Sequence, residues 1–464
     1  MNLVARPLIC VQGLGYVGAA MAICIANVKG KDNVPIFDVI GLDLDTEKGR
    51  HRVAELNDGR FPFMTLDENL VQSAKTCASQ GNFYSTTNVS VLKKVDIVVV
   101  DVQLDVKDLG NDEFDADLAP LEAAIATLGE LLKKGALVVV ETTVPPGCCE
   151  HFIRRILSEA SLKRGLEPRD IMLAHSYERV MPGKNYYNSI SNYWRVYAGE
   201  NPEASKACRM FLKKVINFEK YKLRELSSMT ASETAKIVEN SYRAINIAFM
   251  EEWGTFAEHL GLDMFEIVDA IRDRPSHVNI MEPGLGVGGY CLTKDPHMGK
   301  IGLKKFFSLS SPSFPLSDMG VRINREMAPK NAQKLLDLLG DVENRNVLIL
   351  GAAYKSDVDD TRNSPVLSIF RALSSGGANI TVHDPLVAYW EELELNIDSQ
   401  LPDFSDYYSI ILAVPHEQYS MVNFLSRIKT GKPIIYDCCN MISHADRAVL
   451  RTKGCVVSTI GNGS

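Results

Sequence analysis

The uncharged segment Pro7–Val28 is long enough to cross a lipid bilayer, but three glycines interrupt it. Gly13, Gly15 and Gly18 follow a short apolar run and precede an alanine-rich stretch. This order predicts a β-strand, a tight turn and a helix rather than one membrane-spanning helix. A signal peptide would carry positive charge before its apolar core and small residues at a cleavage site, and both features are poor here. We therefore expect an α/β unit at this position and no membrane segment.

The composition is that of an ordinary globular protein, with 464 residues, 46% of them hydrophobic and 23% charged. At about 150 residues per domain, this length predicts roughly three domains. The net charge of −8 gives no attraction for nucleic acids or an anionic membrane, so we expect neither as a partner. The ten cysteines include no C-x-x-C pair, and their scattered spacing suggests neither a metal site nor a disulfide framework. We predict no metal and a reducing, cytoplasmic compartment.

Short apolar runs alternate with helical patterns at both ends of the chain. They lie at residues 8–11, 39–42, 96–100 and 136–140, and again at 347–351, 380–384, 410–414 and 434–437. Buried β-branched runs separated by helices predict parallel, doubly wound sheets. We therefore expect an α/β protein with two Rossmann-like domains, residues 1–205 and 331–464, joined by a long helix and a helical middle domain, residues 206–330.

Residues 227–261 contain almost no helix breaker and predict one long helix. Thr230 and Glu233 have the spacing of a capping box at its start, and Gly261 has the position of a helix-ending glycine. A helix of this length extends beyond the core of a single domain. It therefore bridges domains or pairs with its copy, and we expect a homodimer or a higher homo-oligomer.

The sequence Gly13-Leu-Gly-Tyr-Val-Gly18 has G-x-G-x-x-G spacing, with a predicted strand before it and a helix after it. Glycines at these positions let the backbone approach a pyrophosphate at the helix N-terminus. Asp43 ends the next predicted strand, where a carboxylate can bind a ribose hydroxyl and repel a 2′-phosphate. These residues predict a cofactor site for NAD, preferred over NADP.

A second glycine-rich segment, residues 283–289, precedes Cys291, and Lys294 and Asp295 follow it. Small neighbours expose the thiol, while a cation and an acid can tune its pKa or move its proton. Cys291 is therefore a candidate nucleophile, and a free cysteine in a glycine loop is the alternative interpretation. Lys236 and Asn240 lie one turn apart on the long helix, where they can stabilise an oxyanion. The alternative for Lys236 is a lysine on a solvated helix face.

Together these motifs resemble the nucleotide-sugar dehydrogenases of the UDP-glucose/GDP-mannose type. The similarity follows the chain in order, through residues 13–18, 142–147 (TTVPPG), 178–183 (ERVMPG), 236–240, 286–295 (GVGGYCLTKD), 351–365 (GAAYKSDVDDTRNSP) and 383–385 (HDP). Members of this family oxidise the C6 alcohol of a nucleotide sugar to a carboxylate with two NAD. The resemblance implies this reaction on a UDP-sugar, through a thiohemiacetal and a thioester on a cysteine.

The resemblance also implies the roles of individual residues. The implied catalytic residues are Cys291 as nucleophile, Lys236 and Asn240 for the oxyanion, Asp295 for proton movement, Glu178 for thioester hydrolysis and Thr143 for ordering water and cofactor. The implied NAD contacts are Gly13, Gly15, Tyr16, Val17, Gly18, Asp43, Lys48 and Thr143. The implied substrate contacts are Glu178, Arg179, Lys236, Asn240, Gly288, Lys355 and Arg362.

Two segments depart from the family pattern. A turn similar to V-P-T-P usually follows the third strand and touches the cofactor, whereas this chain has Asp101-Val-Gln-Leu-Asp105. An arginine just before the glycine loop often reaches the partner's substrate, and here Arg272, Arg274 and His277 are the alternatives.

The signals for the sugar are mixed. The segment 178–183 resembles the branch that acts on N-acetylhexosamines, whereas Lys294 resembles the UDP-glucose branch. We favour a UDP-N-acetylhexosamine, with UDP-glucose as the alternative substrate.

Two other functions compete with this one. A one-step hydroxyacid dehydrogenase of the 6-phosphogluconate type also pairs a dinucleotide domain with a long helix, but it lacks the cysteine loop and the third α/β domain. A non-catalytic nucleotide-sugar sensor on the same fold would have lost Cys291 or Lys236, and both are present.

Overall fold

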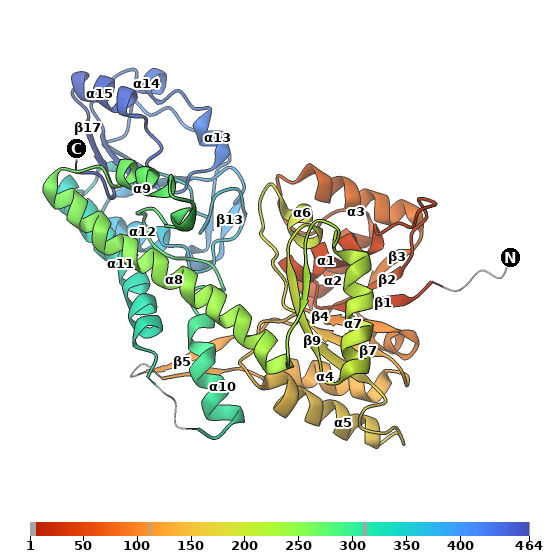
Figure 1. Ribbon diagram of the computed structural model, residues 1–464. Coiled ribbons are helices and arrows are strands. Elements are labelled where there is room, and N and C mark those ends of the chain that lie inside the picture. The colour runs from red at the N-terminus through yellow and green to blue at the C-terminus, as the bar shows by residue number, and fades with distance from the viewer. Residues whose placement is uncertain (1–5, 111–112, 310–312, 464) are drawn as a thin grey trace. The chain divides into compact units, whose positions relative to one another are not determined.

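A computed structural model describes residues 6–110, 113–309 and 313–463. The chain divides into two compact units, one made of residues 1–239 and 297–313, the other of residues 240–296 and 314–464 (Figure 1). Each unit contains its own sheet of mainly parallel strands. No helix within the described ranges is both long and apolar enough to span a membrane.

The first unit is built on a sheet of eight strands within the described residues. In sheet order these are β10 (Leu223–Glu225), β9 (Arg195–Gly199), β8 (Met172–His175), β7 (Leu137–Val140), β4 (Ile97–Val100), β1 (Leu8–Gln12), β2 (Asp38–Leu42) and β3 (Phe83–Thr86). Neighbouring strands run parallel, apart from the antiparallel pair of β8 and β9. The four strands predicted in this part of the sequence are confirmed to within one residue, and the remaining four were not predicted.

Helices cover both faces of this sheet and bury its Val, Ile and Leu side chains, as a parallel sheet requires. One face carries α1 (Tyr16–Ala26), α3 (Glu68–Gln80), α6 (Tyr186–Ser191) and α7 (Pro202–Val215), and the other carries α4 (Ala119–Leu131) and α5 (Arg154–Leu162). The unit also contains α2 (Glu47–Asn57), α10 (Met298–Phe306), the hairpin β5 (Val106–Gly110) and β6 (Glu113–Ala116), and the short turns η1 (Val89–Lys94) and η2 (Cys148–Ile153).

The second unit is built on a five-stranded parallel sheet, again within the described residues. Its strands in sheet order are β12 (Asn379–His383), β11 (Asn346–Leu350), β15 (Ser409–Leu412), β16 (Ile434–Asp437) and β17 (Val456–Thr459). Its helices are α9 (Met264–Arg272), α11 (Pro315–Leu339), α12 (Val366–Ser375), α13 (Glu417–Ser420), α14 (Phe424–Arg427) and α15 (His444–Thr452). The small strands β13 (Tyr389–Trp390) and β14 (Leu395–Asn396) and the turns η3 (Pro275–His277) and η5 (Glu391–Leu393) complete it, and η4 spans Asp295–His297. The predicted α/β class with two doubly wound parallel sheets is confirmed.

The predicted long helix is confirmed as α8 (Met229–Leu260), which begins in the first unit and continues into the second. Gly261 ends it at a φ of +69°, and the Leu262 N–H bonds to the Ala257 carbonyl 2.9 Å away, which is the expected C-terminal geometry. The predicted capping box is wrong. Ser228 caps the helix by accepting the Ala231 N–H at 3.0 Å, while Glu233 bonds to a different part of the chain.

Candidate active site

The glycine turn between β1 and α1 leaves room for an anion at the helix N-terminus. Gly13 has a φ of +97°, and a Cβ there would lie 2.6 Å from the Asp101 carbonyl oxygen. A Cβ on Gly18 would lie 1.8 Å from the Gly13 carbonyl, so both positions require glycine. Gly15 precedes α1, has open space where a Cβ would be and offers no side-chain cap to the first N–H groups of the helix. These residues fit the pyrophosphate of a dinucleotide.

The ribose end of this site contains an ion pair that the sequence did not reveal. Asp43 follows β2, and its Oδ2 lies 2.8 Å from Nη1 of Arg52, while its Oδ1 accepts the Leu44 N–H at 2.8 Å. The acid is therefore placed as predicted, but a guanidinium on α2 lies beside it. Of the other implied NAD contacts, Tyr16 stacks on Phe63 with ring centroids 4.0 Å apart, and Val17 is half-buried. Lys48 lies exposed on α2.

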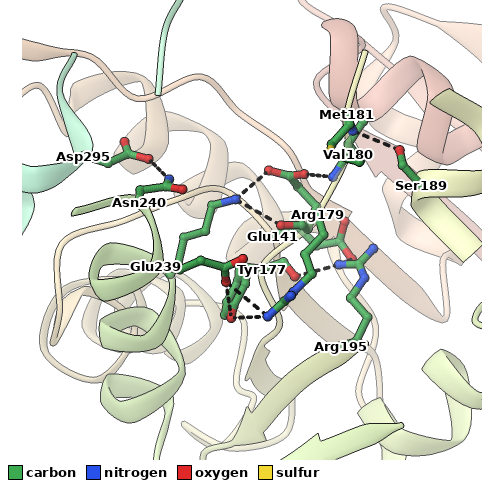
Figure 2. A network of polar contacts seen from close by, with 12 residues as sticks. Glu141, Tyr177, Arg179, Val180, Met181, Ser189, Arg195, Glu239, Asn240 and Asp295 are labelled. Atoms are coloured by element: carbon green, nitrogen blue, oxygen red, sulfur yellow. Dashed lines mark hydrogen bonds and ion pairs between the residues drawn. The ribbon is translucent and has the colours of Figure 1, made fainter. Parts of the chain in front are cut away.

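Lys236 is buried on α8, so the interpretation as a lysine on a solvated helix face is wrong. Its Nζ donates to the Glu178 carbonyl oxygen at 3.1 Å and lies 3.3 Å from Glu178 Oε1. The other carboxylate oxygen of Glu178 accepts the Val180 N–H (Figure 2). The structure thus joins two of the residues implied to be catalytic into one ion pair.

Arg179 points to a different set of partners. Its Nη2 lies 3.1 Å from Oε2 of Glu239 and 3.2 Å from the Tyr177 hydroxyl, and that hydroxyl donates to Glu239 (Figure 2). Thr143 is half-buried in the segment that follows β7. Arg179 is thus paired with Glu239, which lies one helical turn after Lys236.

A buried ion pair beside these residues was missed by the sequence analysis. Arg195 at the start of β9 is 1% exposed, and its Nη1 lies 3.0 Å from Oε1 of Glu141, directly after β7. It also donates to the Tyr177 carbonyl at 2.9 Å (Figure 2). Burial raises the pKa of Glu141 to about 7, although Arg195 acts in the opposite direction. No local pattern could have paired these residues, because they are 54 positions apart.

Glu233, on the same helix as Lys236, fixes the turn that carries Thr143. Its carboxylate accepts the N–H groups of Gly147 at 2.6 Å and Cys149 at 2.7 Å, where the short π-helical turn η2 begins. In return, Glu150 in η2 accepts the Thr230 N–H at 3.3 Å. Each helical segment thus uses an acid to satisfy N–H groups at the start of the other.

The second unit contains the cysteine loop. Cys291 is exposed, whereas the other nine cysteines, all of them described, are buried or half-buried. The Asp295 and Lys294 N–H groups bond to the Cys291 carbonyl at 2.9 and 3.2 Å. The Asp295 carboxylate is fully buried and accepts from Asn240 Nδ2 at 2.6 Å (Figure 2). It also accepts from Lys294 Nζ at 2.7 Å. Asn240, Asp295 and the backbone of Cys291 are therefore connected by hydrogen bonds.

The glycines of this loop lie against the segment 351–365. A Cβ on Gly288 would come within 2.7 Å of the Asn363 carbonyl, and Asn363 Nδ2 donates to the Gly289 carbonyl at 3.1 Å. The Gly289 N–H bonds to the Arg362 carbonyl at 2.9 Å. The two most specific sequence motifs are thus a single packed element, and Gly288 acts by close packing.

Cations gather around this element. Burial and the neighbouring Arg243 lower the pKa of the Lys355 amine. Arg362 Nη2 lies 2.6 Å from Asp360, and its guanidinium lies over the Tyr290 ring, 5.4 Å from the centroid. A site where positive groups repel one another favours an anionic ligand such as a diphosphate. Arg272 is one of the three residues before the glycine loop that could reach the partner's substrate. Its guanidinium is bonded to Glu282 and to the Ile280 carbonyl.

A glycine turn shaped for a dinucleotide, in one unit, and an exposed thiol with neighbouring cations, in the other, define an NAD-dependent oxidoreductase with an anionic substrate. The chain belongs to the UDP-glucose/GDP-mannose dehydrogenase family. The NAD binding domain of that family matches residues 7–216, the central domain matches 230–302 and the UDP binding domain matches 348–444. It is therefore an NAD-dependent nucleotide-sugar dehydrogenase, and the one-step hydroxyacid dehydrogenase and the sensor are excluded.

Relatives extend over nearly the whole chain. The UDP-N-acetyl-D-mannosamine dehydrogenase of Pyrococcus horikoshii is 30% identical over 440 residues, covering 94% of this chain and 96% of its own. The UDP-N-acetyl-D-glucosamine 6-dehydrogenase of Pseudomonas aeruginosa is 28% identical, covering 96% and 99%. Among solved structures, the Pyrococcus horikoshii enzyme superposes with a TM-score of 0.81 at 29% identity, covering 98% of this chain and 99% of its own. The NDP-N-acetyl-D-galactosaminuronic acid dehydrogenase of Methanosarcina mazei gives 0.76 at 27% identity, covering 99% and 96%.

Proposed function

We propose that this enzyme oxidises the C6 alcohol of a UDP-N-acetylhexosamine to the carboxylate, through a thioester on Cys291. The observation that carries the proposal is the exposed thiol of Cys291 in a loop anchored by the hydrogen bond between the half-buried Asn240 and the buried Asp295. Relatives that span nearly the whole chain act on N-acetylated UDP-sugars, which supports this sugar class over UDP-glucose.

NAD supplies the acceptor for one hydride in each of two oxidations, so two NAD are consumed per sugar. The chain's own residues handle protons and charge. The Lys236 ammonium stabilises the alkoxide character that the oxygen on C6 gains as the hydroxyl proton passes to water and the hydride leaves the carbon. The Cys291 sulfur then adds to the aldehyde carbon and forms a thiohemiacetal, whose oxygen needs the same stabilisation in the second oxidation.

Hydrolysis completes the reaction. Glu178 lies 3.3 Å from Lys236 and is the candidate base for the water that attacks the thioester carbon. Thr143 is assigned to the ordering of this water. The C–S bond breaks, the carboxylate leaves and the thiolate of Cys291 regains a proton, and Asp295 is assigned to this proton movement. The covalent step keeps the reactive aldehyde from escaping.

Lys355 and Arg362 are assigned to the diphosphate of the substrate, with Arg243 as a further cation that the sequence analysis did not single out. Arg179 and Gly288 complete the implied substrate contacts. We keep the division into an NAD-binding domain at 1–205, a central domain at 206–330 and a UDP-binding domain at 331–464 as part of the proposal. All ten cysteines lie in the described residues and are thiols rather than disulfides, which supports our proposal of a reducing, cytoplasmic setting.

The enzyme is proposed to form a homodimer through α8. Tyr242, Phe249, Trp253, Phe256 and Leu260 are exposed on this helix although they are large and apolar. Their separations of seven, four, three and four residues keep them on one side of a helix that supercoils with a partner. An unpaired copy would leave this stripe in water, which monomeric proteins avoid.

The experiment is NADH production from a panel of UDP-glucose, UDP-GlcNAc, UDP-GalNAc, UDP-ManNAc and GDP-mannose. We expect two NADH per sugar and the best kcat/KM with an N-acetylated UDP-sugar. Cys291→Ser should abolish carboxylate formation, and Lys236→Ala should lower kcat about 10²–10³-fold. The matched control is Cys439→Ser, because serine can keep the bond that the Cys439 thiol donates to the Ala413 carbonyl at 3.2 Å. One NADH per sugar, or an active Cys291→Ser, contradicts the mechanism.

A further inference from the structure

Two acids stand side by side at the carboxyl edge of the first sheet. Asp101 directly follows β4, Glu141 directly follows β7, and the register pairs Val100 with Val140. Neighbouring strands lie about 4.8 Å apart, and side chains alternate between the faces. Asp101 and Glu141 therefore project from the same face of the sheet, the face that also carries α1.

Asp101 lies at the glycine turn itself. Its N–H bonds to the Gln12 carbonyl at 2.8 Å, and its carbonyl oxygen blocks any Cβ on Gly13. A Cβ on Gly18 would come within 3.2 Å of the Asp101 Cβ, so this side chain borders the first turn of α1. The position lies between β1 and β4, from which the sheet continues in opposite directions and where α/β folds bind their ligands.

Asp101 takes part in no ion pair with another described residue, because the nearby cations are paired with other acids. Glu141 is bonded to Arg195, and Glu178 is bonded to Lys236, while α1 carries no charged residue. The Asp101 Oδ2 atom is buried and has no hydrogen-bond partner among the described residues. The Glu141 Oε2 and Gln12 Oε1 atoms are also buried without one.

Burial is the main reason that the pKa of Asp101 stands well above its ordinary range. The negative charges of Glu141 and Glu178 act in the same direction, and the more weakly acting Arg195 opposes them. A protonated carboxyl donates a hydrogen bond, whereas a carboxylate at this turn would repel the phosphates of a dinucleotide.

We propose that Asp101 is a binding contact for the dinucleotide, with its carboxyl group donating a hydrogen bond to an NAD oxygen at the Gly13–Gly18 turn. This assigns a role to the segment where the chain departs from the V-P-T-P pattern of its family. The proposal depends on NAD binding alone and is independent of the sugar and of the thioester on Cys291.

The test measures the dissociation constant of NADH by fluorescence in the full-length protein, without sugar. Asp101→Asn keeps a neutral donor of the same size and should bind within threefold of the wild type at pH 7. Asp101→Val keeps the volume but removes the donor, and should bind about tenfold more weakly, as expected for a lost hydrogen bond of about 1.4 kcal/mol. Asp105→Asn, an exposed acid in the same loop, is the matched control and should bind as the wild type does.

Two results would overturn the proposal. One is an Asp101→Asn variant that binds NADH as weakly as Asp101→Val. The other is a wild-type affinity for NADH that rises from pH 5 to 8. Such a rise would show that Asp101 binds as an ionised carboxylate, which accepts a hydrogen bond, rather than as a protonated donor. The circular-dichroism spectrum and the thermal unfolding of the same samples should match the wild type, which shows that each variant is folded. The wild-type pH series needs no variant, so it tests the proposal even if a substitution prevents folding.

Discussion

Replacement of Glu233 by alanine should destabilise the protein more than any single change at an exposed acid. The side chain is 1% exposed and accepts two backbone N–H groups, from Gly147 at 2.6 Å and from Cys149 at 2.7 Å. A hydrogen bond to a charged group is worth about 1.5–3 kcal/mol, and a buried donor left without a partner costs a similar amount. Two such bonds give about 3–6 kcal/mol, a large part of the roughly 5–15 kcal/mol by which a folded protein is stable.

Thermal unfolding followed by circular dichroism measures this loss. In a unit of this size, about 1 kcal/mol shifts the midpoint by about 2–4 °C, so Glu233→Ala should lower the first transition by at least about 6 °C. The control is Glu150→Ala, which removes the reciprocal bond to the Thr230 N–H but at an exposed position and a length of 3.3 Å. A lost cap of this kind costs about 1 kcal/mol or less.

The comparison of the two acids is decisive. If Glu233→Ala melts within about 2 °C of Glu150→Ala, the bonds at Gly147 and Cys149 do not fix the turn, and the reasoning from buried donors is wrong. If Glu233→Ala melts at the expected lower temperature, its kcat should fall as well, because Thr143 and Lys236 lie on the two segments that Glu233 joins.

Three further results are expected. Asp43→Asn should raise kcat/KM for NADP relative to NAD about tenfold or more, because Arg52 loses the carboxylate 2.8 Å away and can bind a 2′-phosphate; an unchanged ratio would contradict this role. Phe256→Asp, which places a charge in the exposed stripe of α8, should convert the dimer to a monomer in light scattering at micromolar concentration, whereas a dimer of unchanged affinity would place the interface elsewhere. Burial raises the pKa of Glu251 from 4.5 to about 7, so over that range the folded chain holds a proton that the unfolded chain has lost, and stability falls as pH rises. Glu251→Gln should therefore be more stable than the wild type at pH 8 by about 1–3 kcal/mol, and equally stable at pH 4.5, as measured by urea unfolding. A Glu251→Gln variant that is less stable than the wild type at pH 8 would show that the fold favours the charged form of Glu251.

The sequence by itself determined the parts of the protein that depend on local pattern. Apolar runs bounded by breakers located eight strands, because burial on both faces permits only apolar residues there. The glycines at 13, 15 and 18 located the dinucleotide turn, because a side chain at two of those positions would collide with the backbone. The near-absence of helix breakers between 229 and 260 determined α8. The glycine-rich segment before Cys291 predicted an exposed thiol, and the structure confirms the exposure.

Only the tertiary structure decided which charges meet. The capping-box spacing at Thr230 and Glu233 was misleading, since the carboxylate found two buried N–H donors 84 and 86 positions away. The same holds for Arg195, whose partner Glu141 lies on a strand far away in sequence. It holds equally for Arg52, which forms an ion pair with Asp43, the acid that was assigned to the ribose. Local spacing decides what one helix or strand can do, whereas the protonation and pairing of a buried acid depend on every element that packs around it.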